Sequence, residues 1–499
     1  MQRTLLLTLT LGALGALAPL DAAAVPACGL QGSASTITDG SGYVWDIDEV
    51  GAVWNGSSDA YDAGMAMIVD GVDFPLSAKV QNGNEVTVGP ATLSGLTVTR
   101  SVFVSPTTNF ARWVDTFANP TGNDIIVSLA YQSNPGADSN FTVFDSSNGN
   151  ATLETSDLWV GTDDASNGGG DPSLYFNIHD NTTEYRPSSV TTTVFNCFGT
   201  QGVGWEYGSL VVPAGKTVGI LTVLGQNPDQ ATASANGTTF SDPSNVMEGI
   251  TADQRRAVVN WTLPKEILVV SDSTTDENIA DALSPFHNVT LVSNGYDTTT
   301  QGTTPLEGFL TPYDVVYWSA TGTGFGSLNA SSPMYANLAN WVFGGGRIYV
   351  TGYDSIDSPD DPDLALFVGG TGSTADLFNG QVPGPLASIY SSLTYGAVDV
   401  RGVTPSDGFT DRDGLTAIAP GTISVATSAG DPNQFQWVIR PLGAGEIAYV
   451  SNGATPNNGT FPNGHDSWVD PTSAYNASLL NFALGAGGAA TATNVDPVA

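Results

Sequence analysis

The sequence predicts a multidomain protein in which an all-β sandwich is followed by a doubly wound α/β domain. Residues 36–226 contain short alternating or aromatic-rich runs between clusters of Gly, Asn, Asp and Pro, a pattern typical of antiparallel strands. From residue 266 onward, apolar strand-like runs alternate with helical segments, which indicates a parallel sheet covered on both faces. Since 41% of the residues are hydrophobic, the chain has enough apolar surface for two cores.

The first domain is expected to span residues 25–240. Its clearest strands are expected at residues 96–104, 110–117, 124–132, 173–179 and 210–224, the last run divided by a Pro-Ala-Gly-Lys turn. Asp242 and Pro243 form a typical helix start, so one helix is expected from there through Arg255 and Arg256. Residues 262–264 are expected to act as a linker, which completes a helix-and-linker segment at residues 241–264.

The second domain is expected at residues 265–485, before a small, polar tail at residues 486–499 that is expected to be disordered. Its strands are expected at residues 266–272, 288–293, 313–319, 347–351 and 446–451, with a β-rich stretch at 423–439. Its helices are expected at residues 277–286, 334–343 and 474–484.

The N-terminus has the layout of a secretory signal peptide. A short positive region ends at Arg3, an apolar run covers residues 5–20, and residues 22–24 offer an Ala-x-Ala cleavage site. The apolar run is too short for a membrane span. We therefore expect residues 1–24 to be removed and the chain to be secreted, periplasmic or attached to the cell surface.

The chain has two cysteines, Cys28 and Cys197. An even number in an exported protein favours one disulfide, which would tie the mature N-terminus to the first domain. Alternatively, Val25-Pro26-Ala27-Cys28 resembles a weak lipoprotein signal, in which Cys28 would carry a lipid. Both interpretations stay open at this point.

The charge balance excludes polyanionic partners. Forty-nine acidic residues stand against 13 basic ones, for a formal net charge of −36. Nucleic acids and anionic membrane surfaces are bound by clustered Lys and Arg, and the sequence shows no such cluster. Divalent cations are the expected counter-charge.

Several segments of the second domain resemble the class I glutamine-amidotransferase-like group, including the trehalose-utilisation-type domains of secreted bacterial proteins. They are the strand at residues 266–272, the run Tyr313-Asp-Val-Val-Tyr-Trp318, the Gly-Gly-Gly-Arg segment that begins at Gly344, and Gly445-Glu-Ile-Ala-Tyr-Val450. The resemblance implies a flavodoxin-like fold. It also implies a catalytic cysteine after the strand that ends at Thr351, where this chain has Gly352-Tyr353-Asp354.

The missing cysteine argues against glutamine hydrolysis. Tyr353 cannot replace a thiolate as the acyl acceptor, because a phenol with a pKa of about 10 stays protonated. The second domain is therefore expected to be a degenerate member of the group, which leans towards a non-enzymatic role. In the first domain, the run that begins Phe110-Ala-Arg-Trp-Val-Asp115 is similar to large β-sandwich modules of exported bacterial proteins, some of the galactose-mutarotase-like kind. That similarity implies carbohydrate contact or surface display.

Three sets of candidate site residues follow. Loops at the carboxyl ends of parallel strands gather at the binding crevice of such folds, which gives a candidate pocket of Gly322, Gly324, Tyr353, Asp354, His465 and Asp466. Five carboxylates suit the hard oxygen ligation of calcium, with a solvated acidic loop as the alternative: Asp354, Asp357, Asp360, Asp361 and Asp363. Flat aromatic rings beside Asp, Gly or Asn are candidates for stacking on sugars: Trp45, Trp54 and Trp468.

Two further residue types are assigned non-catalytic roles. His179 and His287 lie next to expected strands and are interpreted as structural. Asn-x-Ser/Thr sequons, which matter only in a host that glycosylates, occur for example at Asn140, Asn150, Asn181, Asn236 and Asn260.

The leading hypothesis is an exported, non-catalytic binding or cell-surface module for glycans or other cell-surface polymers, stabilised by calcium. One alternative is an extracellular hydrolase that acts on carbohydrate or another polymer through loop carboxylates such as Asp272 or Asp354, provided that two carboxylates face each other. A second alternative is a structural component of a surface layer or filament.

Overall fold

The structure is a computed structural model that describes part of the chain. The described residues are 32–137, 140–164, 167, 170–181, 183, 185–196, 199–270, 280, 283–284, 287–292, 310–319, 333–352, 362–371, 374–376, 381–383, 413–428 and 431–451. The predicted signal peptide, the helix predicted at residues 474–484 and the predicted tail lie outside them, as does most of the helix predicted at residues 277–286. None of the described helices is long and apolar enough to span a membrane.

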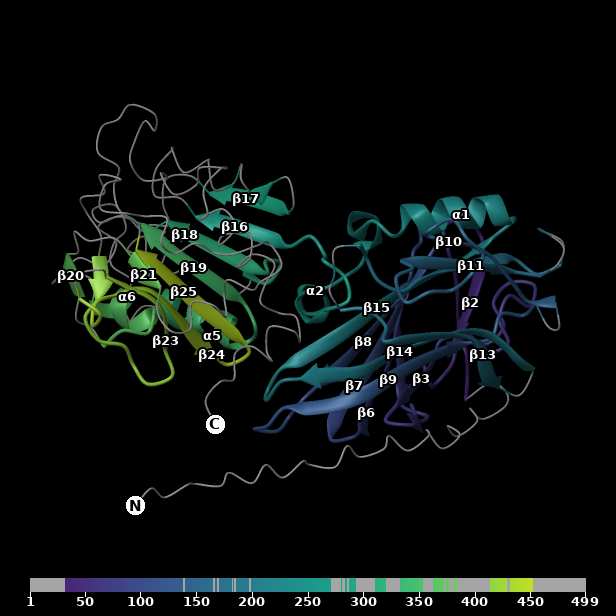
Figure 1. Ribbon diagram of the computed structural model, residues 1–499, viewed down its shortest axis with the longest axis horizontal. Helices are drawn as coiled ribbons and strands as arrows, with labels where there is room; N and C mark the ends of the chain where they lie inside the picture. The colour runs from purple at the N-terminus through teal and green to yellow at the C-terminus, as the bar shows by residue number, and fades with distance from the viewer. Residues whose placement is uncertain are drawn as a thin grey trace, which may run out of the picture.

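The first part of the chain forms a sandwich of antiparallel sheets (Figure 1). Within the described residues, one sheet has the order β10 (Thr142–Ser146), β11 (Trp159–Asp163), β12 (Ser173–Asn177), β15 (Thr217–Asn227), β8 (Ala111–Ala118), β7 (Leu96–Val104), β6 (Glu85–Leu93) and β5 (Lys79–Asn82). The other has the order β13 (Ser189–Asn196), β14 (Gly199–Val212), β9 (Ile125–Ser133), β3 (Ala66–Val69) and β4 (Val72–Asp73). A separate hairpin joins β1 (Ser35–Thr38) to β2 (Val44–Ile47).

The alternation seen in the sequence places the sandwich core. On β7, Leu96, Val98, Val102 and Val104 are all buried in one hydrophobic cluster, while the alternate residues Thr97, Thr99, Ser101 and Phe103 are more exposed. Side chains of the second sheet, including Leu129 of β9, belong to the same cluster. Because successive side chains of a strand point to opposite faces, the period of two predicted β7, β8 and β9 to within one residue. It missed most of β14, which begins at Gly199 and not at the predicted Leu210.

Helix α1 (Gln230–Thr239) lies inside the region predicted to be entirely β. The residues of α1 are small and polar, which gives them weak helix propensity. The helix begins where the Asp229 side chain accepts a hydrogen bond from Thr232 N, and its Gly237 packs so closely on Trp159 that a Cβ there would lie 2.7 Å from the ring. Packing on the sheet and the Asp229 cap therefore stabilise α1, although its own residues favour a helix only weakly.

The single helix predicted from Asp242 through Arg256 is wrong. The structure has a short 3-10 helix, η2 (Pro243–Val246), and a separate helix, α2 (Ala252–Ala257). Between them Gly249 has φ +69°, a left-handed conformation that ends helical geometry. Helix α2 then starts afresh with a capping box between Thr251 and Gln254.

The second part of the chain contains a parallel sheet. Strands β17 (Asn288–Val292), β16 (Glu266–Val270), β18 (Val315–Ser319), β19 (Arg347–Gly352) and β25 (Gly445–Ser451) pair in parallel in that order. Beyond β25 the sheet continues with antiparallel pairings through β24 (Phe435–Leu442), β22 (Asp413–Leu415) and β20 (Thr374–Asp376), and β23 (Ile423–Ser428) pairs with β24 and β21 (Gln381–Pro383). The protein is thus a β-rich multidomain chain.

Helices cover one face of this parallel sheet. Helices α5 (Pro333–Phe343) and α6 (Pro362–Phe367) share a buried cluster with the sheet, in which Leu338 and Phe367 accompany Val316 and Ile348. The apolar period of α5 had predicted a helix at residues 334–343, which the structure places within one residue.

The connection between the two parts is packed, so the linker predicted at residues 262–264 is not a free tether. Leu263 is 1% exposed and belongs to a buried cluster with Trp261 and Val258. The amide of Thr262 donates a hydrogen bond to the Asp180 carboxylate. The chain therefore passes from the sandwich to the parallel sheet through buried backbone.

Candidate functional site

All six residues of the predicted pocket lie outside the described residues. This applies to Gly322, Gly324, Tyr353, Asp354, His465 and Asp466, and to Asp272 of the hydrolase alternative. The strand that precedes Tyr353 is described: β19 ends at Gly352, one residue beyond the predicted end at Thr351. The pocket and the hydrolase alternative stay predictions.

The predicted calcium ligands are described only at Asp363. This residue lies half-buried in the first turn of α6, while Asp354, Asp357, Asp360 and Asp361 lie outside the described residues. Among the residues that the structure describes, no group of three His, Cys, Asp or Glu side chains is placed to hold a metal ion. Cys28 and Cys197 are also outside them, so the disulfide stays a prediction.

Trp45 cannot stack on a sugar, which corrects one candidate. Its side chain is 0% exposed in the sandwich core, and its Nε1 donates a 3.0 Å hydrogen bond to Asp39 Oδ2. The ring packs against Tyr61 and Trp113 at centroid distances of 5.9 and 6.1 Å. Trp468 lies outside the described residues, which leaves Trp54 as the candidate that the structure can place.

Trp54 lies half-buried at the start of a loop of residues 54–64, here named the Trp54 loop. The Asp46 carboxylate fixes the start of this loop, because it accepts hydrogen bonds from the amides of Asn55 (3.0 Å) and Gly56 (2.8 Å). At the other end, Asn134 accepts from the Asp62 amide at 2.9 Å. The loop backbone is thus held at both ends by the sandwich.

The Trp54 loop also contains strained backbone at non-glycine residues. Ser58, Asp59 and Ala63 have φ values of 50°, 66° and 75°, and Met65 just beyond the loop has 64°. Each such residue costs about 1–3 kcal/mol, and these conformations cluster at functional sites. Packing holds them in place: a Cβ at Gly136 would lie 1.5 Å from Asp59 O.

Polar residues follow Trp54 along the loop. Asn55, Ser58 and Asp59 are exposed, and Asp62 is half-buried. The loop therefore combines a half-buried indole with exposed amide, hydroxyl and carboxylate groups, the kinds of group that ligand sites use together.

Tyr61 is the fully buried residue of the Trp54 loop, and its side chain anchors the loop in the sandwich core. Burial first, and then the Asp39 charge, raise the pKa of Tyr61 well above its ordinary value. Burial also raises the pKa of Asp39, an effect that its hydrogen bond from Trp45 opposes. Tyr61 therefore stays neutral and supports the loop as a rigid, apolar base.

His179 and His287, which the sequence analysis interprets as structural, are both buried. His179 Nδ1 lies 2.7 Å from Asp180 O.

The sequence did not predict a further polar cluster around Asp314, where two neighbouring arginines of α2 meet one buried carboxylate. The adjacent pair Arg255-Arg256 in a chain with only 13 basic residues was the available signal.

The comparisons with known proteins give no family. No family model matches the chain, and no curated protein matches it. Solved structures that resemble it include a cytoplasmic protein from Salmonella typhimurium LT2, with 14% identity over 39% of this chain and 91% of that one at a TM-score of 0.28. A putative aldose 1-epimerase from Escherichia coli K12 has 8% identity over 39% of this chain and 98% of that one at a TM-score of 0.27.

A galactose mutarotase-like protein from Lactobacillus casei ATCC 334 is similar to the same extent, with 10% identity over 39% of this chain and 99% of that one at a TM-score of 0.27. All three TM-scores lie below 0.5, so they establish neither a family nor an activity for this chain.

Proposed function

We propose that the chain is an exported, non-catalytic carbohydrate-binding protein whose sandwich holds a glycan at the Trp54 loop. The observation that carries the proposal is the half-buried Trp54 on a strained loop whose backbone is held by hydrogen bonds to Asp46 and Asn134. A loop already fixed in one conformation loses little entropy when it binds. An indole ring contributes binding energy when the ligand covers its face and removes it from water, which is why Trp is frequent among binding hot spots.

The second domain is proposed to be a doubly wound, flavodoxin-like scaffold that resembles amidotransferase-like domains. The strand order β17-β16-β18-β19-β25, all parallel, supports this proposal. In the sequence after β19, Tyr353 stands where the group has cysteine, which supports a non-catalytic role. Calcium at Asp354 to Asp363 is part of the proposal and is tested with it.

The experiment is a glycan array followed by calorimetric titration of the full mature chain, with calcium chloride or with a chelator. We expect at least one oligosaccharide to bind, and Trp54→Ala to weaken that binding by at least about tenfold, or about 1.4 kcal/mol. Trp54→Phe, which keeps a flat ring, is expected to retain part of the affinity.

The matched control is Trp159→Phe. It changes a buried indole of the same sandwich that packs on Gly237 of α1, so it is expected to lower the melting temperature and to leave glycan affinity unchanged. If no glycan binds to the unmodified chain, or if Trp54→Ala binds as well as the unmodified chain, the proposal is wrong.

A further inference from the structure

The junction between the two domains gathers basic residues that are rare elsewhere in the chain. The sequence has 13 Lys and Arg residues in total. Five of them meet at this junction: Lys216, Arg255, Arg256, Lys265 and Arg347. This concentration of positive charge is unusual in a chain of net charge −36, and it distinguishes the junction from the rest of the molecule.

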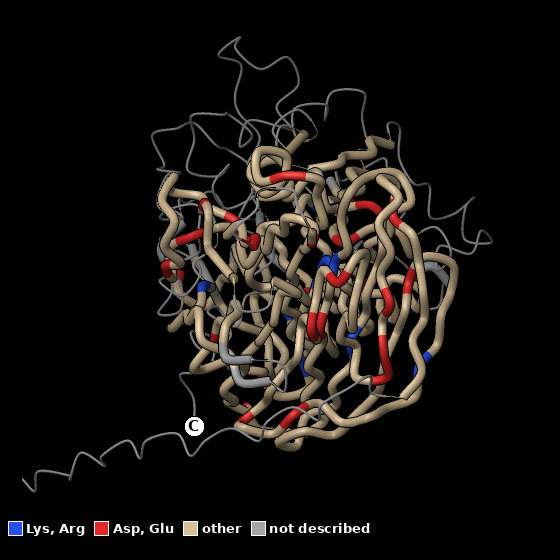
Figure 2. The backbone as a smooth tube through the Cα atoms, turned by 90° about the vertical axis from the view of Figure 1, so that its right-hand side faces the viewer, with Lys and Arg blue, Asp and Glu red and all other residues tan. Residues whose placement is uncertain are grey.

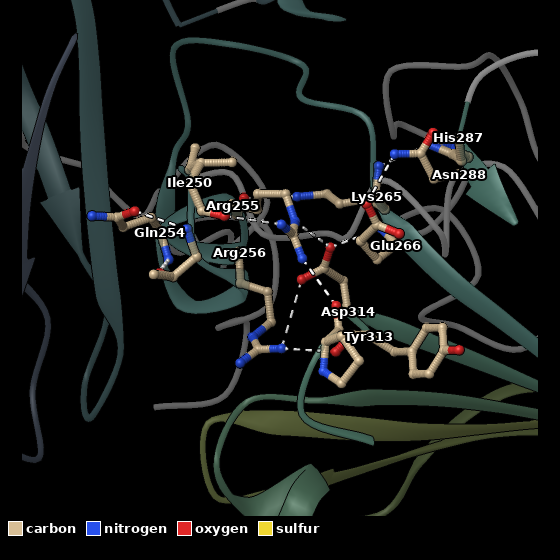
Figure 3. A network of polar contacts seen from close by, with 12 residues as sticks. Ile250, Gln254, Arg255, Arg256, Lys265, Glu266, His287, Asn288, Tyr313 and Asp314 are labelled. Atoms are coloured by element: carbon tan, nitrogen blue, oxygen red, sulfur yellow. Dashed lines mark hydrogen bonds and ion pairs between the residues drawn. The ribbon is translucent and has the colours of Figure 1, made fainter. Parts of the chain in front are cut away.

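Asp314 is the centre of the junction (Figure 3). Its side chain is 1% exposed, and its Oδ2 lies 2.8 Å from Arg255 Nε of the first domain. Its Oδ1 lies 3.6 Å from Arg256 Nη1. The same Oδ2 accepts a 2.9 Å hydrogen bond from the Glu266 amide of β16. One buried carboxylate therefore joins helix α2 to two strands of the parallel sheet.

Backbone carbonyls complete the contact in both directions. Arg255 Nη2 donates to Pro312 O at 3.0 Å, and Arg256 Nη1 donates to Tyr313 O at 3.1 Å. In return, Lys265 Nζ donates to Arg255 O at 2.8 Å. A second contact lies apart from Asp314, where Lys216 Nζ of the β14–β15 turn donates to Ala444 O at 2.6 Å.

All of these contacts lie at the amino ends of the parallel strands. Glu266 opens β16, Asp314 directly precedes β18, and Arg347 opens β19. Ala444 directly precedes β25. The sandwich thus docks on the amino edge of the sheet, where the parallel strands begin.

We infer that this amino edge is an interaction surface whose partner is the chain's own sandwich, and that Asp314 is the positioning residue that locks the two domains into one cooperative unit. Polar interfaces between domains ordinarily permit relative motion. Here Asp314, Arg255 and Lys265 are buried, and removing the carboxylate leaves the two cations without compensation in a low-dielectric site. The buried connection at Trp261 and Leu263 also restricts the relative motion of the two domains that a free linker would permit.

The experiment compares the full mature chain with Asp314→Asn and Asp314→Ala by differential scanning calorimetry. We expect one transition in the unmodified chain, with equal calorimetric and van't Hoff enthalpies. Both variants are expected to show two resolved transitions, because each domain then melts separately. Asp253→Ala is the matched control: this carboxylate also pairs with Arg256, but its side chain is 86% exposed, so a single transition is expected.

A second measurement separates positioning from a general loss of stability. Small-angle scattering and limited proteolysis at 20 °C, below the transitions, report the domain arrangement directly. For Asp314→Asn we expect a larger radius of gyration and new cleavage near residues 258–265, with the near-ultraviolet circular dichroism retained. Lys216→Met gives a milder variant that tests the second contact if Asp314→Ala does not fold.

Two resolved transitions in the unmodified chain would overturn the inference. An Asp314→Asn variant with a single transition and an unchanged radius of gyration would also overturn it.

Discussion

An ion pair inside the sandwich core shows what single residues contribute. Arg100 of β7 and Asp115 of β8 are paired in the strand register, and both are buried among apolar side chains. Arg100 Nε lies 2.9 Å from Asp115 Oδ1, and Arg100 Nη1 donates to Val50 O at 2.9 Å. The guanidinium therefore connects two strands to the segment that follows β2.

Asp115→Ala is expected to lower the free energy of unfolding by about 3–5 kcal/mol, because it leaves the Arg100 charge buried without its partner. The double variant Arg100→Met with Asp115→Leu is expected to recover most of that loss, since it removes both charges. Urea unfolding followed by tryptophan fluorescence measures both. A single variant that loses less than about 1 kcal/mol would contradict this account.

Residue-level predictions failed where tertiary burial decided the outcome. Trp45 and Trp54 have similar sequence neighbours, yet Trp45 alternates with Ile47 on β2 and points into the core. The period of two could have distinguished them. Asn260 begins a sequon but is buried, and its Nδ2 donates to the carbonyls of Ile178 and Leu221 at 2.8 Å. By contrast, Asn150 is exposed.

At the scale of elements, the strands were predictable because alternation is a local property. The β7 strand at Leu96–Val104 coincides with its predicted bounds. Helices α1 and α2 were not predictable in the same way, since α1 depends on Trp159 of another element and the break before α2 on the φ of one glycine. The Trp54 loop was predicted at its tryptophan only, because backbone strain leaves no mark in the sequence.

The environment of His287, in the turn before β17, predicts that acid lowers the stability of the fold. Burial, and secondarily the Lys265 charge, lower the pKa of His287 from 6.5 to about 4. The geometry agrees, because His287 Nδ1 accepts a hydrogen bond from Lys265 N at 3.2 Å and cannot do so when protonated. Between pH 6.5 and about 4 the unfolded chain thus binds a proton that the folded chain does not.

Stability is therefore expected to fall as the pH drops through this window, by about 3 kcal/mol from this group at pH 4. The measurement is urea unfolding at several pH values for the unmodified chain and for His287→Gln, which has no titrating ring. The difference between the two curves isolates His287. Parallel curves would show that another group causes the acid sensitivity.

At the scale of the whole molecule, the contact between the sandwich and the amino edge of the parallel sheet determines how the two domains are arranged. The division into an antiparallel and a parallel part followed from the sequence, because the change of pattern at residue 266 coincides with the start of β16 at Glu266. The docking itself did not follow, because it joins Arg255 to Asp314, 59 positions apart. Contacts between distant segments carry no periodic signal in the sequence.

The positions of the cations have one more consequence, which concerns encounters between copies of the protein. Arg100 and Arg112 lie in the interior, and five more basic residues face the junction, so few positive charges remain to offset the acidic groups that line the sandwich (Figure 2). Two molecules should therefore repel each other in dilute buffer. Light scattering is expected to give a positive second virial coefficient at about 10 mM salt that falls markedly near 0.5 M, where the screening length is a few ångströms. Any ordered array of these molecules would need salt or divalent cations to bring its members together.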